Sequence, residues 1–388
     1  MSMTSYRDWI VGRALPAWSS IGYDAVAGRF RERLDQAGRP IDVPHRAMVQ
    51  ARQIYVFAHA AELGWFDGGT LAEATMASLL RDAYVESGGQ GSFAFSVDRG
   101  GKVVSATRDA YTHAFALFAL AWLYRLNGDG RLLDIADRTL AFIDAALADL
   151  VHGGLFDAVP IATPDKRQNP LMHLLEACLF LAQAAPSRAY LDRAADLVAL
   201  FKQRLFRDPP GILREHFTQA WDDHADPAKA DLFEPGHHFE WVWLLDEYAR
   251  LSGEDVRRWT EPLYATARRH GIAPSGLIFD EVGGDMRVRK ASHRVWPHTE
   301  AIKAAVARRR RGDTRARAFA DGMAARLLET FLDRPFAGGW IDHVGPDGAP
   351  LVDYVPASSL YHLFLAAAET ASLPAEVSAT PLPEPART

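Results

Sequence analysis

The stretch PGHHFEWVWLLDEYARL, residues 235–251, opens with a proline and a glycine, passes through two histidines and continues as an apolar run with helical spacing. Proline suits the first turn of a helix, where its missing N–H would have no partner. Similar apolar runs occupy residues 114–123, 171–184 and 359–368, and the chain has almost no alternating strand pattern. The stretch therefore predicts one helix of a mainly helical protein.

Histidines recur along the chain about every 60 residues, which indicates a repeated unit. Paired glycines, such as Gly88-Gly89 and Gly153-Gly154, separate the apolar runs and leave room for a turn and a short extended piece. Each unit is therefore expected to hold two helices and a hairpin-like insert. The recurring histidines, each expected at or near the start of an apolar run, are His59, His113, His173, His237, His298 and His362.

Six such units predict an (α/α)6 barrel, an all-α fold with short β-hairpins in the loops at one end. A single unit cannot bury its apolar faces alone and must pack on its neighbours. Closing the array into a ring removes both exposed ends. We expect one catalytic domain over residues 1–371, which begins with an irregular lead-in over residues 1–15, and a disordered Pro-rich tail over residues 372–388.

The composition of the 388 residues limits the classes of protein to consider. A hydrophobic fraction of 48% allows a large core, and a formal net charge of −6 gives no reason to bind nucleic acid or an anionic membrane. The single cysteine excludes a disulfide framework and multi-cysteine metal sites. No apolar run approaches the roughly 20 residues that span a bilayer, and no export signal is recognised. We expect a cytoplasmic monomer or homodimer.

If the histidine-bearing helices form the inner ring, their first turns meet at one end of the barrel and line a pocket. The densest cluster is residues 235–241, in which His237 and Glu240 lie three residues apart on one helix face. A carboxylate beside an imidazole raises its basicity and fixes its tautomer, as a general acid or base requires. His173 and Glu176 repeat this spacing, with Asn169 one turn earlier.

Each histidine taken alone could also be a hydrogen-bonded structural residue, so we expect two or three of the six to be chemical. Two His-x-x-Glu pairs could suggest a metal site, but bundle di-iron sites carry Glu-x-x-His, and a His-Glu-x-x-His zinc motif is absent. Imidazole, carboxylate, guanidinium and aromatic groups together suit a neutral ligand with many hydroxyl groups, such as a sugar. Neither a phosphate-binding glycine loop nor a Gly-x-Ser-x-Gly motif occurs.

These motifs resemble those of the N-acylglucosamine 2-epimerase superfamily, which includes cellobiose 2-epimerases, mannose isomerases and sulfoquinovose isomerases. The resemblance covers residues 52–362 and implies an (α/α)6 barrel with a monosaccharide substrate and no metal or redox cofactor. It rests on Pro-Gly-His-x-x-Glu-Trp at 235–241, Asn-Pro-x-Met-His-Leu-x-Glu-Ala at 169–177, Trp-Pro-x-Thr-Glu at 296–300 and Tyr-His at 361–362.

The resemblance also implies roles for single residues. His237 and His362 match the two essential histidines, and Glu240 matches the acidic partner of His237. The residues expected to hold or orient the sugar are Arg52, Tyr111, Asn169, His173, Glu176 and Trp296.

Ala357 indicates the branch of the family. In the family that this chain resembles, disaccharide-acting 2-epimerases have a tryptophan five residues before the final histidine. In this sequence that position is Ala357. The segment is more similar to the mannose isomerase branch, which interconverts D-mannose and D-fructose. We therefore expect an aldose–ketose isomerase for these sugars, and also for D-lyxose and D-xylulose, that works through a cis-enediol. His362 is assigned as the C2/C1 base and His237 as the ring-opening acid/base, two roles that could be exchanged.

Three alternatives stay open at this point. A 2-epimerase would use the same two histidines and return the proton to C2 from the opposite face. A glycoside hydrolase or lyase would need two carboxylates about 5–10 Å apart, and the candidates Glu240 and Glu176 both lie beside histidines. A non-catalytic sugar- or peptide-binding array is the third alternative.

Overall fold

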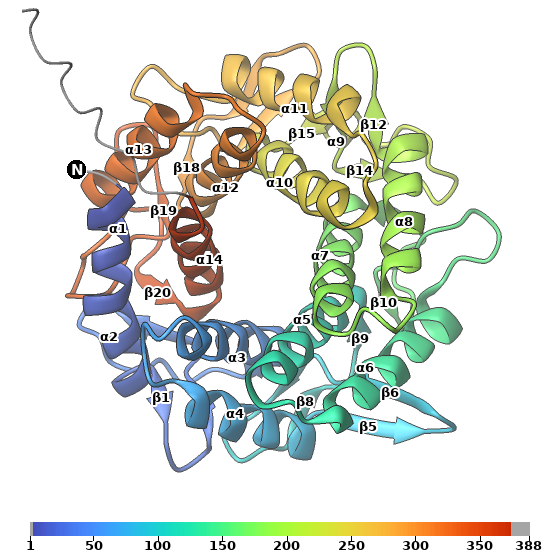
Figure 1. Cartoon of the computed structure of the whole chain (residues 1–388), viewed down its shortest axis with the longest axis vertical. Coiled ribbons are helices and arrows are strands. Elements are labelled where there is room, and N and C mark those ends of the chain that lie inside the picture. The colour runs from blue at the N-terminus through green and yellow to red at the C-terminus, as the bar shows by residue number, and fades with distance from the viewer. Residues whose placement is uncertain (1–2, 374–388) are drawn as a thin grey trace, which may run out of the picture.

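The computed structural model describes residues 3–373, which form six pairs of helices arranged as two concentric rings (Figure 1). The predicted (α/α)6 barrel is confirmed. The inner helices are α3 (Ala47–Glu62), α5 (Ala110–Asn127), α7 (Gln168–Ala184), α10 (Pro235–Ser252), α12 (Trp296–Arg310) and α14 (Leu360–Ala371). The outer helices are α1 (Met3–Trp9) with α2 (Leu15–Ser20), α4 (Gly69–Asp82), α6 (Gly130–Phe142), α8 (Tyr190–Leu200), α11 (Arg257–His270) and α13 (Ala316–Arg326), and α9 (Pro227–Ala230) is a short helix in a loop.

The two rings differ in how much of each helix is buried. α10 is buried continuously from Pro235 to Tyr248, because other elements surround it. Its proline lies in the first turn, as the sequence predicts. α11 instead buries one stripe with the i, i+3, i+4, i+7 spacing of a helix that has one face on the core and one in water. The stripe contains Thr260, Leu263, Tyr264 and Ala267.

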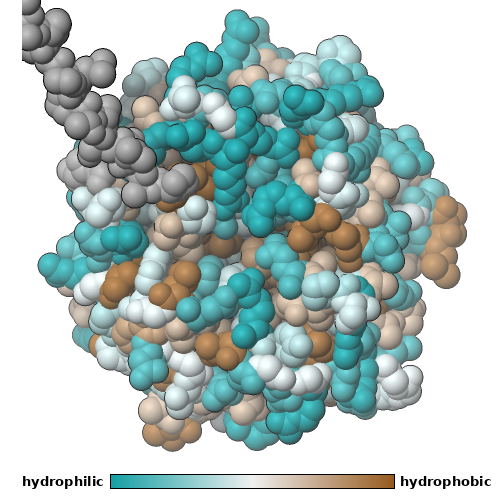
Figure 2. All heavy atoms as spheres, viewed as in Figure 1, coloured by the Kyte–Doolittle hydropathy of each residue, from teal (hydrophilic) through white to brown (hydrophobic). Residues whose placement is uncertain are grey.

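Aromatic side chains fill the axis of the barrel, so the ring is not a pore. The ring centroid of Tyr55 lies 4.5 Å from that of Phe118 and 5.2 Å from that of Trp122. Figure 2 shows that side chains cover the middle of the ring, which is open in the ribbon drawing, and that hydrophobic side chains form only small separate groups on this face. None of the helices within residues 3–373 is long and apolar enough to cross a membrane.

Short strands link each unit to the next. A strand lies shortly before each inner helix and pairs antiparallel with a strand that follows the outer helix of the same pair, and the last of these pairs joins Tyr354–Pro356 to Arg33–Asp35. The predicted hairpins within single units also occur, as β5–β6 and β12–β13. The linking pairs are β4 (His45–Arg46) with β7 (Ser96–Val97), β9 (Arg108–Asp109) with β10 (Ala158–Val159), β11 (Lys166–Arg167) with β14 (His216–Phe217), β15 (Leu232–Phe233) with β16 (Glu281–Gly283), β18 (His293–Arg294) with β19 (His343–Val344), and β20 (Tyr354–Pro356) with β3 (Arg33–Asp35). The remaining strands are β1 (Tyr23–Asp24), β2 (Arg29–Phe30), β5 (Tyr84–Ser87), β6 (Gln90–Phe93), β8 (Val103–Ser105), β12 (Phe206–Arg207), β13 (Ile212–Leu213) and β17 (Val288–Lys290).

The expected irregular lead-in over residues 1–15 is wrong for its described part. α1, a π-helical turn over Ile10–Ala14 and α2 run on from one another and form the outer partner of α14. Gly12 and Pro16 read as helix breakers in the sequence, but Pro16 lies in the first turn of α2, where a proline is tolerated. The predicted tail over residues 372–388 lies outside the described residues beyond Leu373.

Two long-range hydrogen bonds hold this first helix in the ring. The backbone N–H of Met3 donates to Asp321 of α13 at 3.0 Å, and the hydroxyl of Tyr6 donates to the carbonyl of Leu363 in α14 at 2.5 Å. The ring is therefore closed by contacts between the first and last helices of the described chain.

Candidate active site

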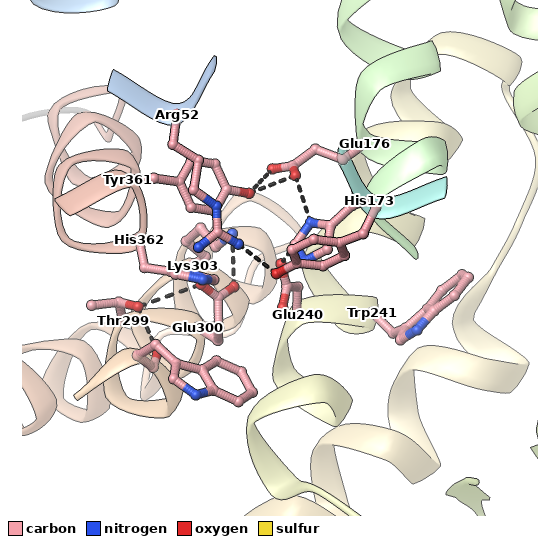
Figure 3. A network of polar contacts seen from close by, with 12 residues as sticks. Arg52, His173, Glu176, Glu240, Trp241, Thr299, Glu300, Lys303, Tyr361 and His362 are labelled. Atoms are coloured by element: carbon pink, nitrogen blue, oxygen red, sulfur yellow. Dashed lines mark hydrogen bonds and ion pairs between the residues drawn. The ribbon is translucent and has the colours of Figure 1, made fainter. Parts of the chain in front are cut away.

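A cavity of about 690 Å³ opens at the end of the ring where the inner helices begin. Each inner helix contributes a side chain from its first turns, because the helices converge there. Of the nine predicted site residues, eight line this cavity: Arg52, Tyr111, Asn169, His173, His237, Glu240, Trp296 and His362. The ninth, Glu176, is fully buried and hydrogen-bonds His173, which lines the cavity, and the buried Tyr361 (Figure 3).

His237 is paired with a carboxylate that the sequence does not point to. Its Nδ1 lies 2.9 Å from the carboxylate of Glu215, which also accepts hydrogen bonds from Gln168 Nε2 at 2.9 Å and the backbone N–H of Glu234 at 3.1 Å. Burial alone would lower the pKa of His237, but the carboxylates of Glu215 and Glu234 outweigh it and raise this pKa to about 10. His237 is therefore a cation at neutral pH.

The predicted pairing of His237 with Glu240 is not the contact that forms. Glu240 lies on the same helix three residues later, yet the hydrogen bond of His237 goes to Glu215, in the loop after β13. Glu215 is 22 residues away in sequence and lies in a loop, so spacing along a helix could not identify it, although it follows a glycine-marked segment in the same way as Asp157 and Asp342.

His362 has the opposite charge state. Its Nδ1 lies 2.8 Å from the carboxylate of Glu300, so this hydrogen bond occupies Nδ1 and not Nε2. Burial lowers the pKa of His362 well below its ordinary value, and the nearby cations Arg52 and Lys303 lower it further. His362 is therefore a neutral imidazole, able to accept a proton at neutral pH.

Trp296 lies beside both histidines. Its ring centroid is 4.9 Å from that of His237 and 5.6 Å from that of His362. A protonated and a neutral imidazole thus flank one indole ring, which offers an apolar face to a ligand between them.

Glu240 occupies the floor of the cavity without a hydrogen-bond partner for either carboxyl oxygen. The nearest imidazole atom recorded beside it is His173 Nδ1, at 3.9 Å. Burial, and then the charge of Glu300, raise the pKa of Glu240 well above its ordinary value. A raised pKa makes this carboxyl group easier to protonate, and in its protonated form it can donate a hydrogen bond to a ligand hydroxyl or carbonyl group.

Arg52 supplies the guanidinium group of the cavity. It donates to the Tyr111 hydroxyl at 2.6 Å and to the Ser358 carbonyl at 3.1 Å, and it lies 4.1 Å from the ring centroid of Phe115. These contacts hold a planar cation with further N–H donors at the cavity wall.

Three other buried histidines are structural. His113, His238 and His298 each accept a hydrogen bond at Nε2 from a buried backbone N–H of a preceding strand or turn, at 3.1, 3.0 and 3.0 Å. Burial lowers their pKa values to about 4, 4 and 3, so they are neutral. His59 lies near the end of α3 rather than its start, stacked on Trp122 at 3.8 Å. Of the six recurring histidines, three line the cavity: His173, His237 and His362.

Three sets of carboxylate and imidazole atoms lie within 4.8 Å of one another, the spacing a metal ion would need: His173–Glu176–Glu240, Glu215–Glu234–His237 and Glu240–Glu300–His362. In each set the imidazole already hydrogen-bonds a carboxylate of the same set. We assign none of them as a metal site, and the lack of a metal cofactor stays a prediction.

Comparison with known proteins places this site in context. The profile of a family described as N-acylglucosamine 2-epimerase (GlcNAc 2-epimerase) matches residues 28–366. The chain is 32% identical to a mannose-6-phosphate isomerase of Rhizobium meliloti (strain 1021), over 92% of this chain and 94% of that protein. It is 28% identical to a D-mannose isomerase of Thermobifida fusca, over 66% and 67%. A cellobiose 2-epimerase structure from Bacillus thermoamylovorans B4167 superposes with a TM-score of 0.83 at 19% identity, over 95% of this chain and 98% of that one.

Proposed function

The chain belongs to the N-acylglucosamine 2-epimerase family, and from this premise we propose that it is a sugar aldose–ketose isomerase that interconverts D-mannose and D-fructose. The observation that carries the proposal is the pair of histidines with opposite charge states in one cavity, His237 protonated and His362 neutral. Groups whose surroundings push their pKa values apart are a general mark of an acid and a base acting in one site. Isomerisation through an enediol requires both.

The reaction begins with opening of the pyranose ring. His237 donates its proton to the ring oxygen and takes the proton of the C1 hydroxyl in its place, which yields the open-chain aldose and returns His237 to its protonated form. The hydrogen bond to Glu215 keeps the cation in place for this step. A positioned acid or base of this kind typically contributes about 10²–10⁴-fold to the rate.

His362 then acts on the carbon atoms. Its Nε2 removes the proton from C2 to give a cis-enediol. A proton moves from the C2 oxygen to the C1 oxygen, and His362 returns the first proton to C1. The product is the ketose. Arg52 is the donor that stabilises the negative oxygen of the intermediate, and Glu240 adds a second donor when it is protonated. Atoms and charge balance, because the proton removed from C2 is the one added at C1.

A 2-epimerase is the second candidate, since it shares the enediol and differs in where the proton returns. His173, a third neutral imidazole at the cavity wall, favours keeping it, because delivery from a second position is what epimerisation needs. Ala357 argues for the isomerase of a monosaccharide. It is fully buried, and its carbonyl accepts a hydrogen bond from Gln53 at 2.7 Å, so this position offers no aromatic surface for a second sugar ring.

We further propose that the reaction needs no metal ion, and that the protein is a cytoplasmic monomer or homodimer that does not bind nucleic acid. Whether the preferred hexose carries a phosphate is tested alongside, because one relative is named for mannose 6-phosphate. Arg33, Arg46 and Arg294 line the cavity and could meet an anionic group. Light scattering in solution measures the oligomeric state.

The test is incubation with D-mannose, and separately with D-mannose 6-phosphate, in D₂O containing EDTA, followed by NMR of the products. Fructose from mannose supports the isomerase, and turnover in EDTA supports the metal-free reaction. Glucose labelled with deuterium at C2, with little fructose, would move the protein to the epimerase alternative. If neither sugar changes, the proposal fails.

A further inference from the structure

Lys303 is a buried cation among three carboxylates beneath the cavity. It lies on α12, is fully shielded from solvent, and its Nζ lies 2.7 Å from the carboxylate of Glu300 and 3.9 Å from the ring centroid of Trp243 (Figure 3). It does not line the cavity. Burying an ammonium group is costly unless it is compensated, and here the surrounding carboxylates outweigh burial and raise the pKa of Lys303.

Glu300 connects this cation to the catalytic base. One of its oxygens pairs with Lys303, and the other lies 2.8 Å from Nδ1 of His362. A carboxylate that accepts a hydrogen bond from Nδ1–H fixes the tautomer of the imidazole and leaves Nε2 unprotonated. A protonated Glu300 would instead donate to Nδ1, and the imidazole proton would then reside on Nε2, where the base must accept one.

The charge of Glu300 therefore determines whether His362 works, and burial opposes that charge. Burial raises the pKa of Glu300, and the ammonium group of Lys303 opposes the rise. We propose that Lys303 is a positioning residue of the reaction: it keeps Glu300 ionised, so that the single proton of the neutral His362 stays on Nδ1 and Nε2 is free to act as the base. This inference rests on the proposed function, because it assigns His362 as the base.

Several other charged or titratable groups face Lys303, Glu300 and His362 and affect their protonation. Glu176 and Glu240 are the other two carboxylates near Lys303, and Arg52 is the other buried cation. The remaining titratable neighbours of Lys303, Glu300 and His362 are His173 from α7, His237 from α10, Tyr361 from α14 and Tyr6 from α1. Among the lysines and arginines that the structure describes, only Lys303 forms an ion pair with Glu300.

The experiment compares the pH dependence of kcat/KM in the wild type and in Lys303→Met. Removing the cation lets the Glu300–His362 pair hold a proton to higher pH, whichever of the two carries it. The acid limb of the profile should then move to higher pH by about one pH unit or more, as expected for a charge lost within hydrogen-bonding distance. At a pH on that limb, activity should fall about tenfold or more.

Lys166→Met is the matched control. Lys166 is also fully buried, pairs with Asp149 at 2.8 Å and lies 4.7 Å from the ring centroid of Trp221, but it does not line the cavity. Both variants should lower the melting temperature, and only Lys303→Met should move the acid limb. In a Glu300→Gln background, adding Lys303→Met should move the limb less than it does in the wild type, because only the direct effect of the lysine charge on His362 then remains.

If Lys303→Met does not fold, Lys303→Gln keeps a hydrogen-bond donor without the charge and tests the same expectation. A folded, uncharged variant at this position with the acid limb of the wild type would overturn the proposal. A wild type without activity on any hexose would overturn the proposed function instead, so the two failures are distinguishable.

Discussion

Replacing Glu215 by glutamine tests the assignment of His237 as the ring-opening acid. The substitution keeps the size of the side chain and removes the charge that lies 2.9 Å from Nδ1 of His237. That charge is the largest of the contributions that raise the pKa of His237 to about 10. Without it, only the weaker effects of Glu234 and Glu240 oppose burial, so we expect the pKa of His237 to fall to near its ordinary value of about 6.5.

The size of the effect follows from these two values. At pH 7.5, a group with a pKa of about 10 is about 99% protonated, whereas a group with a pKa of about 6.5 is only about 9% protonated. Loss of the acid form alone should therefore lower the rate about tenfold at this pH, and loss of the orientation held by the carboxylate should lower it further. In the pH profile, the alkaline limb should move from near pH 10 to below pH 7.

The assay is kcat/KM for conversion of mannose to fructose between pH 5.5 and 10.5. Glu247→Gln is the control, because Glu247 is equally buried and ion-paired, but with Arg250 on α10 and Arg310 on α12, away from the cavity. An alkaline limb that stays near pH 10 in Glu215→Gln, or one that moves instead in Glu240→Gln, would refute the reasoning and restore the pairing expected from the sequence.

Four further outcomes follow from the structure. His362→Asn should lower kcat/KM about 10²-fold or more with an unchanged circular dichroism spectrum, and an active variant would contradict its role as base. His298→Ala leaves the buried N–H of Ile278 without an acceptor, so chemical denaturation should show a loss of about 1–3 kcal/mol while activity per folded molecule is kept. Arg310→Ala removes pairs with two carboxylates at 2.8 Å and should lower the melting temperature without changing KM. The pKa of His237 in the folded protein lies above its value of about 6.5 in the unfolded chain. Its contribution to stability is therefore complete below pH 6.5 and is lost as the pH rises through about 10. Calorimetry of His237→Asn should show no such decline.

The inner ring could be predicted because it follows a repeat. Helices whose surfaces are apolar on every side, all but α3 opened by a proline or histidine at a spacing of about 60 residues, leave few arrangements other than a closed array. The same reasoning predicts that Arg52, His173, His237 and His362 meet at one end of the barrel, and these four residues line one cavity.

The remaining features depend on contacts that no local pattern encodes. Glu215 reaches His237 from a loop, and the period of a helix carries no information about a loop residue. Lys303 is one charged residue in a run that otherwise looks like a buried helix, so the sequence cannot show that three carboxylates surround it. The helical turns on either side of Gly12 and Pro16 form because α13 and α14 supply a surface for them, which local propensity does not report.

The position of that first helix has a consequence for how the chain folds. Five outer helices pack beside inner helices that are near neighbours in sequence, so their contacts form at a small cost in loop-closure entropy. The sixth pair joins Met3 to Asp321 and Tyr6 to Leu363, across 318 and 357 residues. Contacts between residues so far apart in sequence form late and slow the folding of the chain. A partly folded chain would be an open crescent whose two ends expose matching apolar faces. At high concentration those faces would join two chains before either ring closes. The refolding yield should therefore fall as the protein concentration rises.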